Sequence, residues 1–155
     1  MKDFLNKIKE EGKLELIEPS EEVSKAYTKK SESYLSSAKL LLKNNHLEES
    51  VSMAYYSMYY ILSSLLFKTG IKSENHSASI MLLKEIYSIE NKDIHYAKKE
   101  RIDKQYYVDF EVTKDEVKEL IKKAEAFHKK IYSFIQKLNS KDIEIYREKF
   151  NKLFR

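Results

Sequence analysis

Hydrophobic side chains recur every three or four positions along almost the whole chain, which is the spacing of one face of an α-helix. No stretch alternates between hydrophobic and polar residues for long enough to predict a β-strand, and residues 14–19 are expected to form a connector. Helices are predicted over residues 1–12, about 20–44, 47–69, 93–104, 114–138 and 141–153, with one more that contains Ile80, Leu83, Ile86 and Tyr87. This pattern predicts an all-α fold: an antiparallel up-and-down bundle of four to five long helices with short terminal helices.

Residues that favour helix ends stand at these boundaries. N-terminal caps are expected at Ser20, at Ser73 or Asn75, at Thr113 and at Ser140. Thr113 and Glu116 have the spacing of a capping box, in which the side chain of each residue accepts a hydrogen bond from the backbone N–H of the other. Gly12 and Gly70 stand at the C-terminal ends of the first and third predicted helices. Glycine readily adopts the left-handed conformation that ends a helix, so both residues are expected to act as C-terminal stop signals.

The segment 47–69 carries two stripes on different faces. Its larger, apolar stripe consists of Val51, Ala54, Tyr55, Met58, Ile61, Leu62, Leu65 and Leu66. A second stripe of Ser50, Ser57 and Ser64 recurs every seven positions, and such small side chains let a neighbouring helix approach closely. We therefore expect this helix at the centre of a single domain, residues 1–155, with its core over about 20–138. A helix that is apolar or small on most faces also predicts a homodimer, because one bundle layer does not easily cover it.

Composition narrows the function classes. The chain has 155 residues with only two Gly, one Pro and no Cys, which excludes a phosphate loop, a dinucleotide fold, a thiolate metal site and a cysteine nucleophile. The net charge of +4 permits nucleic-acid binding without arguing for it. The N-terminus lacks the apolar core of a secretory signal, and the uncharged segment 50–67 is too rich in Ser and Tyr for a membrane span. We expect a cytoplasmic protein without a cofactor.

The histidines form no motif. His46, His76, His95 and His128 lie far apart, without the spacing of a metal site, and no serine has the surroundings of a hydrolase nucleophile. We expect no bound metal. His46 is predicted to be a loop or N-cap residue. His128 lies off the apolar stripe of its helix and is predicted to be a solvated surface residue.

Four tyrosines, Tyr55, Tyr56, Tyr59 and Tyr60, cluster in the central helix. A run of aromatic residues invites the hypothesis of a platform on which nucleic-acid bases stack. On a helix, however, these four side chains point to different sides. The favoured interpretation is that they pack around the helix, with their hydroxyl groups reaching polar partners.

Arg101 stands out because the chain has only three arginines among 29 basic residues, and Tyr106 and Tyr107 follow it closely. A planar guanidinium suits carboxylate or phosphate, and tyrosine supplies a hydroxyl and a flat ring. One interpretation is a ligand site for phosphate or an RNA backbone. The other is a structural clamp, with Arg101 buried against tyrosine or paired with Asp103 or Asp109.

Several of these segments, taken together and in order, resemble the HEPN domain of prokaryotes. The segments are Ala54–Tyr60, Leu65-Leu66, Gly70-Ile71, His76-Ser77, Arg101 with Gln105-Tyr106, and Ala124 with Phe127. The resemblance covers about residues 24–138 and is greatest to small single-domain HEPN proteins. It implies a helical bundle that dimerises, often encoded beside a minimal nucleotidyltransferase as toxin and antitoxin.

The resemblance does not extend to the RNase motif of the family, R-x(4–6)-H, in which Arg steadies phosphate and His helps to cleave RNA. Positions 106, 107 and 108 are Tyr, Tyr and Val, so no His follows Arg101 at that spacing. Tyrosine ordinarily has a pKa near 10 and is a poor replacement as acid or base at neutral pH. The family also implies that a partner enzyme can adenylylate a tyrosine near this motif, where Tyr106 or Tyr107 lies.

Three functions stay open. The leading hypothesis is a homodimeric module that binds nucleotide or RNA, or acts with a nucleotidyltransferase, in a toxin–antitoxin type system. Its candidate ligand-binding residues are Arg101, Tyr106, Tyr107 and His76, its candidate modified residues are Tyr106 and Tyr107, and no catalytic residue is assigned. The second is a HEPN ribonuclease that uses Arg101 with Tyr106, Tyr107, His76 or His95. The third is a scaffold that binds no ligand.

Overall fold

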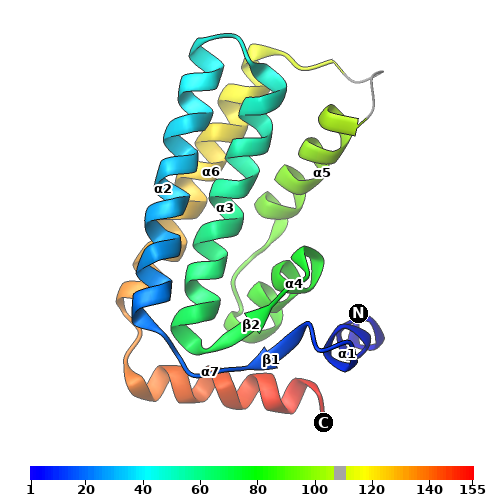
Figure 1. The fold of residues 1–155 in the computed structure, drawn as a ribbon, viewed down its shortest axis with the longest axis vertical. Coiled ribbons are helices and arrows are strands. Elements are labelled where there is room, and N and C mark those ends of the chain that lie inside the picture. The colour runs from blue at the N-terminus through cyan, green and yellow to red at the C-terminus, as the bar shows by residue number, and fades with distance from the viewer. Residues whose placement is uncertain (107–110) are drawn as a thin grey trace.

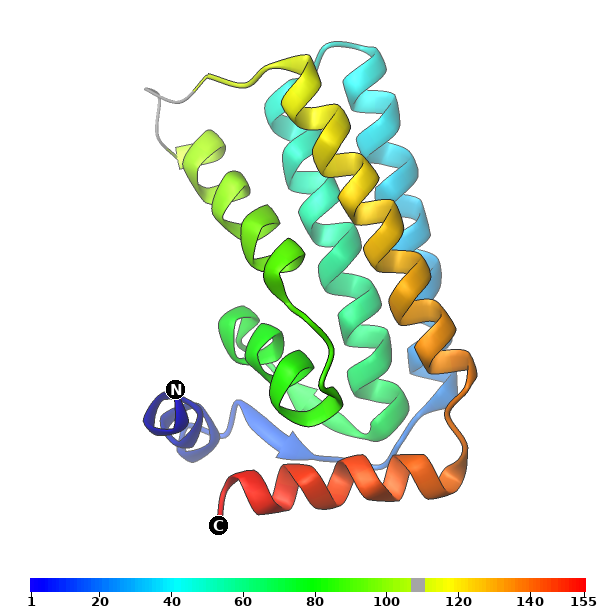
Figure 2. The ribbon, with the colours of Figure 1, turned by 180° about the vertical axis from the view of Figure 1, so that it is seen from behind.

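Four helices that alternate in direction form the body of the protein (Figure 1). They are α2 (Glu21–Lys43), α3 (Leu47–Thr69), α5 (Lys92–Tyr106) and α6 (Lys114–Gln136). The computed structural model describes residues 1–106 and 111–155. Helix α3 contacts the three others, with α2 and α5 on opposite sides of it (Figures 1 and 2). The predicted all-α up-and-down bundle is confirmed.

The contact between α2 and α3 is made by small residues that match along both helices. Ser24, Ser31 and Ala38 recur every seven positions on α2, and they lie opposite Ser64, Ser57 and Ser50 of the antiparallel α3. Each pair is buried and joined to the facing backbone: Ser64 donates to the Ser24 carbonyl at 2.7 Å, Ser31 to the Ser57 carbonyl at 2.6 Å, and Ser50 to the Ala38 carbonyl at 2.7 Å. We call this contact the serine seam. It confirms the close approach that the stripe of small residues predicted.

The remaining elements gather at one end of the bundle (Figures 1 and 2). They are α1 (Lys2–Glu10), β1 (Leu14–Leu16), β2 (Ile71–Ser73), α4 (His76–Tyr87) and α7 (Ser140–Leu153). The expectation of no strand is wrong, because β1 and β2 pair antiparallel with Leu14 opposite Ser73 and Leu16 opposite Ile71. Three residues are too few for a pattern of period two, and the pairing partner is distant in sequence.

Arg147 of α7 fixes this end of the bundle to the last turn of α3. Its Nη1 donates to the carbonyls of Ile17 at 2.8 Å and of Thr69 and Gly70 at 3.1 Å. Thr69 is the last residue of α3 and Gly70 is its C-cap, so Arg147 satisfies carbonyls that the helix itself leaves without a partner. Gly70 has φ +75°, and a Cβ atom there would collide with Arg147 Nη1 and the Ile17 carbonyl. Arg147 is therefore committed to structure.

Most helix ends follow the predicted signals. Ser20 accepts from the Val23 N–H and Asn75 from the Ala78 N–H, and α3 ends at Gly70. Two expectations need correction. Thr113 accepts from the Glu116 N–H, but the Glu116 carboxylate pairs with Lys104 at 3.2 Å. The last helix is capped by Asn139, which forms a full capping box with Asp142, and Ser140 is its first residue.

One chain covers most of α3 by itself. Helices α2, α4, α5, α6 and α7 all contact it, and its three charged residues lie at its two ends. The burial of α3 therefore does not require a second copy, so the apolar character of this helix alone carries no argument for a dimer.

We expect Ser57→Leu to destabilise the fold strongly, because the larger side chain cannot enter the serine seam without separating α2 from α3. Overpacking of this kind costs about 1–3 kcal/mol. Ser133→Leu, on an exposed position of α6, is the matched control. Urea denaturation of both variants checks this, and equal midpoints would contradict the seam.

Candidate anion-binding site

Arg101 lies on the side of α5 that faces α3. Ala97 lies one turn earlier on the same side and Ile94 two turns earlier, and both are fully buried. The guanidinium carbon of Arg101 stands 5.0 Å from the centre of the Tyr56 ring and 5.8 Å from that of Tyr55, within the range of cation–π contacts. Its Nε is buried without a hydrogen-bond partner. The geometry holds a positive charge against two tyrosine rings.

His76, the first residue of α4, contacts Tyr55 and also the rings of Tyr56 and Tyr59. Its Nδ1 shares a hydrogen bond of 2.7 Å with the Tyr55 hydroxyl, and its ring stacks on Tyr59 with centres 3.8 Å apart. Asn75 caps the helix, so the first N–H groups of α4 lie beside the imidazole. The start of α4 is thereby fixed against the middle of α3.

Lys98 completes the cluster. It lies one turn before Arg101 on α5, and its ammonium donates to the Ser77 hydroxyl at 2.5 Å. Three elements, α3, α4 and α5, therefore bring together Arg101, Lys98 and His76 around Tyr55 and Tyr56. We call these five residues the arginine cluster.

Within residues 1–106 and 111–155, the arginine cluster is positively charged and has no carboxylate paired with its cations. Burial lowers the pKa of His76, and the nearby Lys98 and Arg101 charges lower it further, so the imidazole is neutral at pH 7. Burial and Arg101 also lower the pKa of Lys98. Among the carboxylates of residues 1–106 and 111–155, none forms an ion pair with Arg101 or Lys98. The arrangement suits a bound anion.

Comparison with known proteins supplies a family. The chain matches the HEPN domain over residues 24–139. A UPF0332 protein of Thermotoga maritima is 30% identical over 129 residues, which cover 76% of this chain and 95% of that protein. A UPF0332 protein of Pyrococcus horikoshii is 47% identical over 62 residues, which cover 40% of this chain and 43% of that protein. The chain belongs to the HEPN domain family.

In this HEPN domain, two of the four predicted ligand residues come together, a third lies apart from them, and the fourth is outside the described residues. Arg101 and His76 both belong to the arginine cluster. Tyr106 is 62% exposed at the end of α5, and Tyr107 lies outside the described residues. His95 is exposed, and no hydrogen bond or ion pair within the described segments joins it to Arg101.

The clamp interpretation of Arg101 allowed either burial against tyrosine or pairing with a carboxylate, and the structure meets the first of these. The guanidinium packs on tyrosine rings, as a clamp would. However, Asp103 forms no ion pair with it in the described structure, and Asp109 lies outside the described residues. The rings hold the charge in place without neutralising it.

Sequence reasoning missed Lys98, gave Ser77 no role and named no partner for the Tyr55 hydroxyl. Lysine is so common in this chain that Lys98 carries no signal by itself, although its spacing of three from Arg101 on a predicted helix places both cations on one face. Tyr55 is fully buried, as the core interpretation predicts, yet its hydroxyl contacts His76. The pair His76-Ser77 was noticed only through the family resemblance.

The prediction that His128 is a solvated surface residue is wrong. Its Nδ1 and the buried Ser31 hydroxyl are 2.7 Å apart, and its Nε2 lies 3.9 Å from a Glu32 carboxylate oxygen. Burial lowers the pKa of His128, and Glu32 opposes this shift. The ring therefore links α6 to the serine seam, because small residues on α2 leave room for it.

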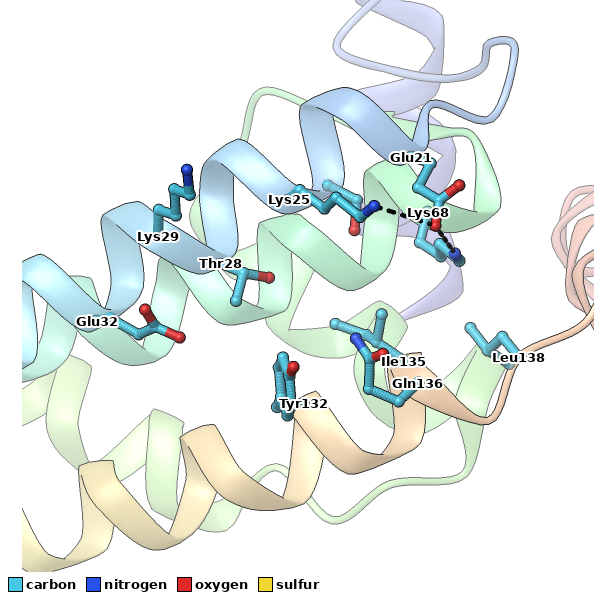
Figure 3. Close-up of a pocket in the computed structure, with 11 residues that line it drawn as sticks. Glu21, Lys25, Thr28, Lys29, Glu32, Lys68, Tyr132, Ile135, Gln136 and Leu138 are labelled. Atoms are coloured by element: carbon cyan, nitrogen blue, oxygen red, sulfur yellow. Dashed lines mark hydrogen bonds and ion pairs between the residues drawn. The ribbon is translucent and has the colours of Figure 1, made fainter.

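A separate cleft of about 550 Å³ lies between α2 and α6 (Figure 3). Its lining includes Lys25 and Lys68, which share the Glu21 carboxylate at 3.7 and 3.4 Å. None of the predicted site residues lines it. Two of its lysines thus have a carboxylate partner, unlike the described cations of the arginine cluster.

Residues 1–106 and 111–155 contain neither a metal-binding group of side chains nor a helix that could span a membrane. No three histidine, aspartate or glutamate side chains lie together there as a metal ion would require. No helix in these segments has both the length and the apolar character needed to cross a membrane.

We expect Lys98→Met to raise the pKa of His76, because it removes a neighbouring positive charge that disfavours protonation of the imidazole. Lys99→Met, on the exposed side of α5, is the control and leaves the titration of His76 unchanged. NMR titration of the histidine ring signals measures both. A His76 titration that is the same in both variants would contradict the arrangement of the cluster.

Proposed function

We propose that the protein binds the phosphate group of a nucleotide or of RNA at the arginine cluster. The observation that carries the proposal is the guanidinium of Arg101, which packs on two tyrosine rings with a buried, unpartnered Nε and no ion pair to a described carboxylate. A half-buried cation without a counter-charge raises the free energy of the folded protein, and a bound anion lowers it again. Arginine offers phosphate a planar pair of donors.

The neighbours of Arg101 favour phosphate over a neutral ligand. Lys98 adds a second positive charge, and the first turn of α4 presents N–H groups and the positive end of a helix dipole. The rings of Tyr55 and Tyr56 lie beside the cations, and a half-buried ring such as Tyr56 offers a flat surface to a base. A nucleotide matches both the charge and the rings.

We further propose that the protein works as a homodimer in a toxin–antitoxin type system, with a minimal nucleotidyltransferase as partner. This part rests on membership of the HEPN family. The exposed Tyr106 at the end of α5 is accessible as an acceptor of AMP. An AMP group there would add a phosphate close to the cations of α5.

A ribonuclease is the second candidate, and the neutral His76 favours it. The R-x(4–6)-H motif is absent, but the fold brings a different histidine to Arg101. A neutral imidazole can accept the proton of an RNA 2′-hydroxyl as its oxygen attacks phosphorus, while Arg101 stabilises the developing charge. The bond from phosphorus to the 5′ oxygen breaks, and that oxygen takes a proton from solvent water. RNA products that end in 2′,3′-cyclic phosphate, and that are absent with the His76→Gln variant, would support cleavage. If the RNA stays intact, the protein binds RNA without cleaving it.

We expect Arg101→Gln to weaken the binding of uridine monophosphate at least tenfold, since hydrogen bonds to a charged group contribute about 1.5–3 kcal/mol. Arg155→Gln, at the exposed C-terminus, is the matched control. Calorimetric titration measures binding, and thermal denaturation follows stability. Unchanged binding with a lower melting temperature would show that Arg101 is only a clamp.

A further inference from the structure

A row of five half-buried aromatic rings runs along the α2–α3 contact. Its members are Phe67, Tyr27, Tyr60, Tyr34 and Tyr56. Neighbouring ring centres are 5.2 Å apart between Phe67 and Tyr27, 5.8 Å between Tyr27 and Tyr60, 5.0 Å between Tyr60 and Tyr34, and 6.3 Å between Tyr34 and Tyr56. We call it the aromatic row.

The aromatic row revises the interpretation of the tyrosine cluster. Tyr55 and Tyr59 do point into the bundle, where both are buried. Tyr56 and Tyr60 instead share one side of α3 and stack with centres 6.0 Å apart. Helix α2 adds Tyr27 and Tyr34 to them, which no pattern within α3 alone can indicate. A continuous surface of rings thus exists, in which Tyr34 meets Tyr56 and Tyr60 edge-on, although only half of the cluster contributes to it.

Cations accompany the aromatic row and connect it to the arginine cluster. The exposed Lys30 has its ammonium 4.4 Å from the centre of the Tyr60 ring and 6.0 Å from that of Tyr34. At the end of the row, the guanidinium of Arg101 stands 5.0 Å from Tyr56. Tyr56 therefore belongs both to the row and to the proposed phosphate site.

Rings accompanied by cations along a continuous path are what proteins use to hold single-stranded nucleic acid, because the rings stack on bases and the cations pair with phosphates. Rings with centres 5.0–6.3 Å apart pack against one another, so no base enters between them, and a base contacts an outer face or edge of the row. Such contact needs bases whose faces are free of stacked neighbours. The row therefore fits unstacked bases of a single strand and does not match a duplex.

We propose that the aromatic row is a track for a short single-stranded RNA segment that continues from the phosphate held at Arg101. This inference rests on the proposed function. It specifies that the ligand is a single strand of several nucleotides and not a mononucleotide or a duplex. A second copy of the chain fits the row less well, because two copies meeting there would bring Lys30 and Arg101 close to their like-charged counterparts. A strand of phosphates complements these charges.

The test compares RNA of increasing length. Fluorescently labelled oligouridylates of three, six and twelve nucleotides are titrated with the protein, alongside unlabelled uridine monophosphate by calorimetry. We expect affinity to rise with length up to the extent of the row and to be weaker for duplex RNA. An affinity for the oligonucleotides no greater than for the mononucleotide would overturn the track and leave the proposed function intact.

The variant Tyr34→Leu/Tyr60→Leu keeps apolar cover over the serine seam while removing two rings. We expect it to bind the hexanucleotide about tenfold or more weakly, since stacking contributes about 1–3 kcal/mol per base, and to bind the mononucleotide as the unaltered protein does. Tyr96→Leu is the matched control, because Tyr96 is an exposed tyrosine on α5 with Lys123 over its ring. Thermal denaturation confirms that each variant is folded.

Other outcomes also decide the matter. If neither the mononucleotide nor any oligonucleotide binds the unaltered protein, the proposed function and the track fall together. If the double variant binds the hexanucleotide normally, the track is overturned. If it binds RNA normally but sediments as a monomer where the unaltered protein is a dimer, the row is an interface between copies of the chain.

Discussion

The close contact of α2 with α3 determines where every other part of this protein lies. Because serine and alanine face each other along the serine seam, the two backbones approach closely and one side of α3 is used for α2 alone. The larger side chains of α3 must then point elsewhere. Tyr55 and Tyr59 are directed toward α4 and α5, where they position His76 and Arg101, while Tyr56 and Tyr60 form a surface with α2.

Charge gives this arrangement its chemical character. The cations of α5 are held by tyrosine rings and a serine hydroxyl, and the neutral His76 lies beside them. Arg147 shows the contrast, since its guanidinium is satisfied by three backbone carbonyls. Two arginines of one chain thus have opposite roles: one completes the fold, and the other retains a charge for which the described structure supplies no counter-ion.

Local signals predicted the helices well, because caps such as Ser20 and Gly70 act within a few residues of themselves. The stripe of Ser50, Ser57 and Ser64 even indicated the close helix contact. What the sequence could not indicate depends on distant partners: the pairing of β1 with β2, and the contact of His128 with Ser31. The site was half predicted for the same reason. Arg101 can be singled out because arginine is rare in this chain. Lysine is common, and the place of Lys98 in the cluster depends on residues that are distant in sequence.

The central claim is that the Arg101 guanidinium binds an anion. The NMR resonance of its own Nε–H group tests this claim most directly. The chain has three arginines, so the three Nε–H resonances are readily assigned with the variants Arg101→Gln and Arg155→Gln. Titration with inorganic phosphate should move the Arg101 signal saturably while that of Arg147, which is committed to backbone carbonyls, stays in place. An Arg101 signal that does not move, or moves only as the exposed Arg155 does, would contradict the account.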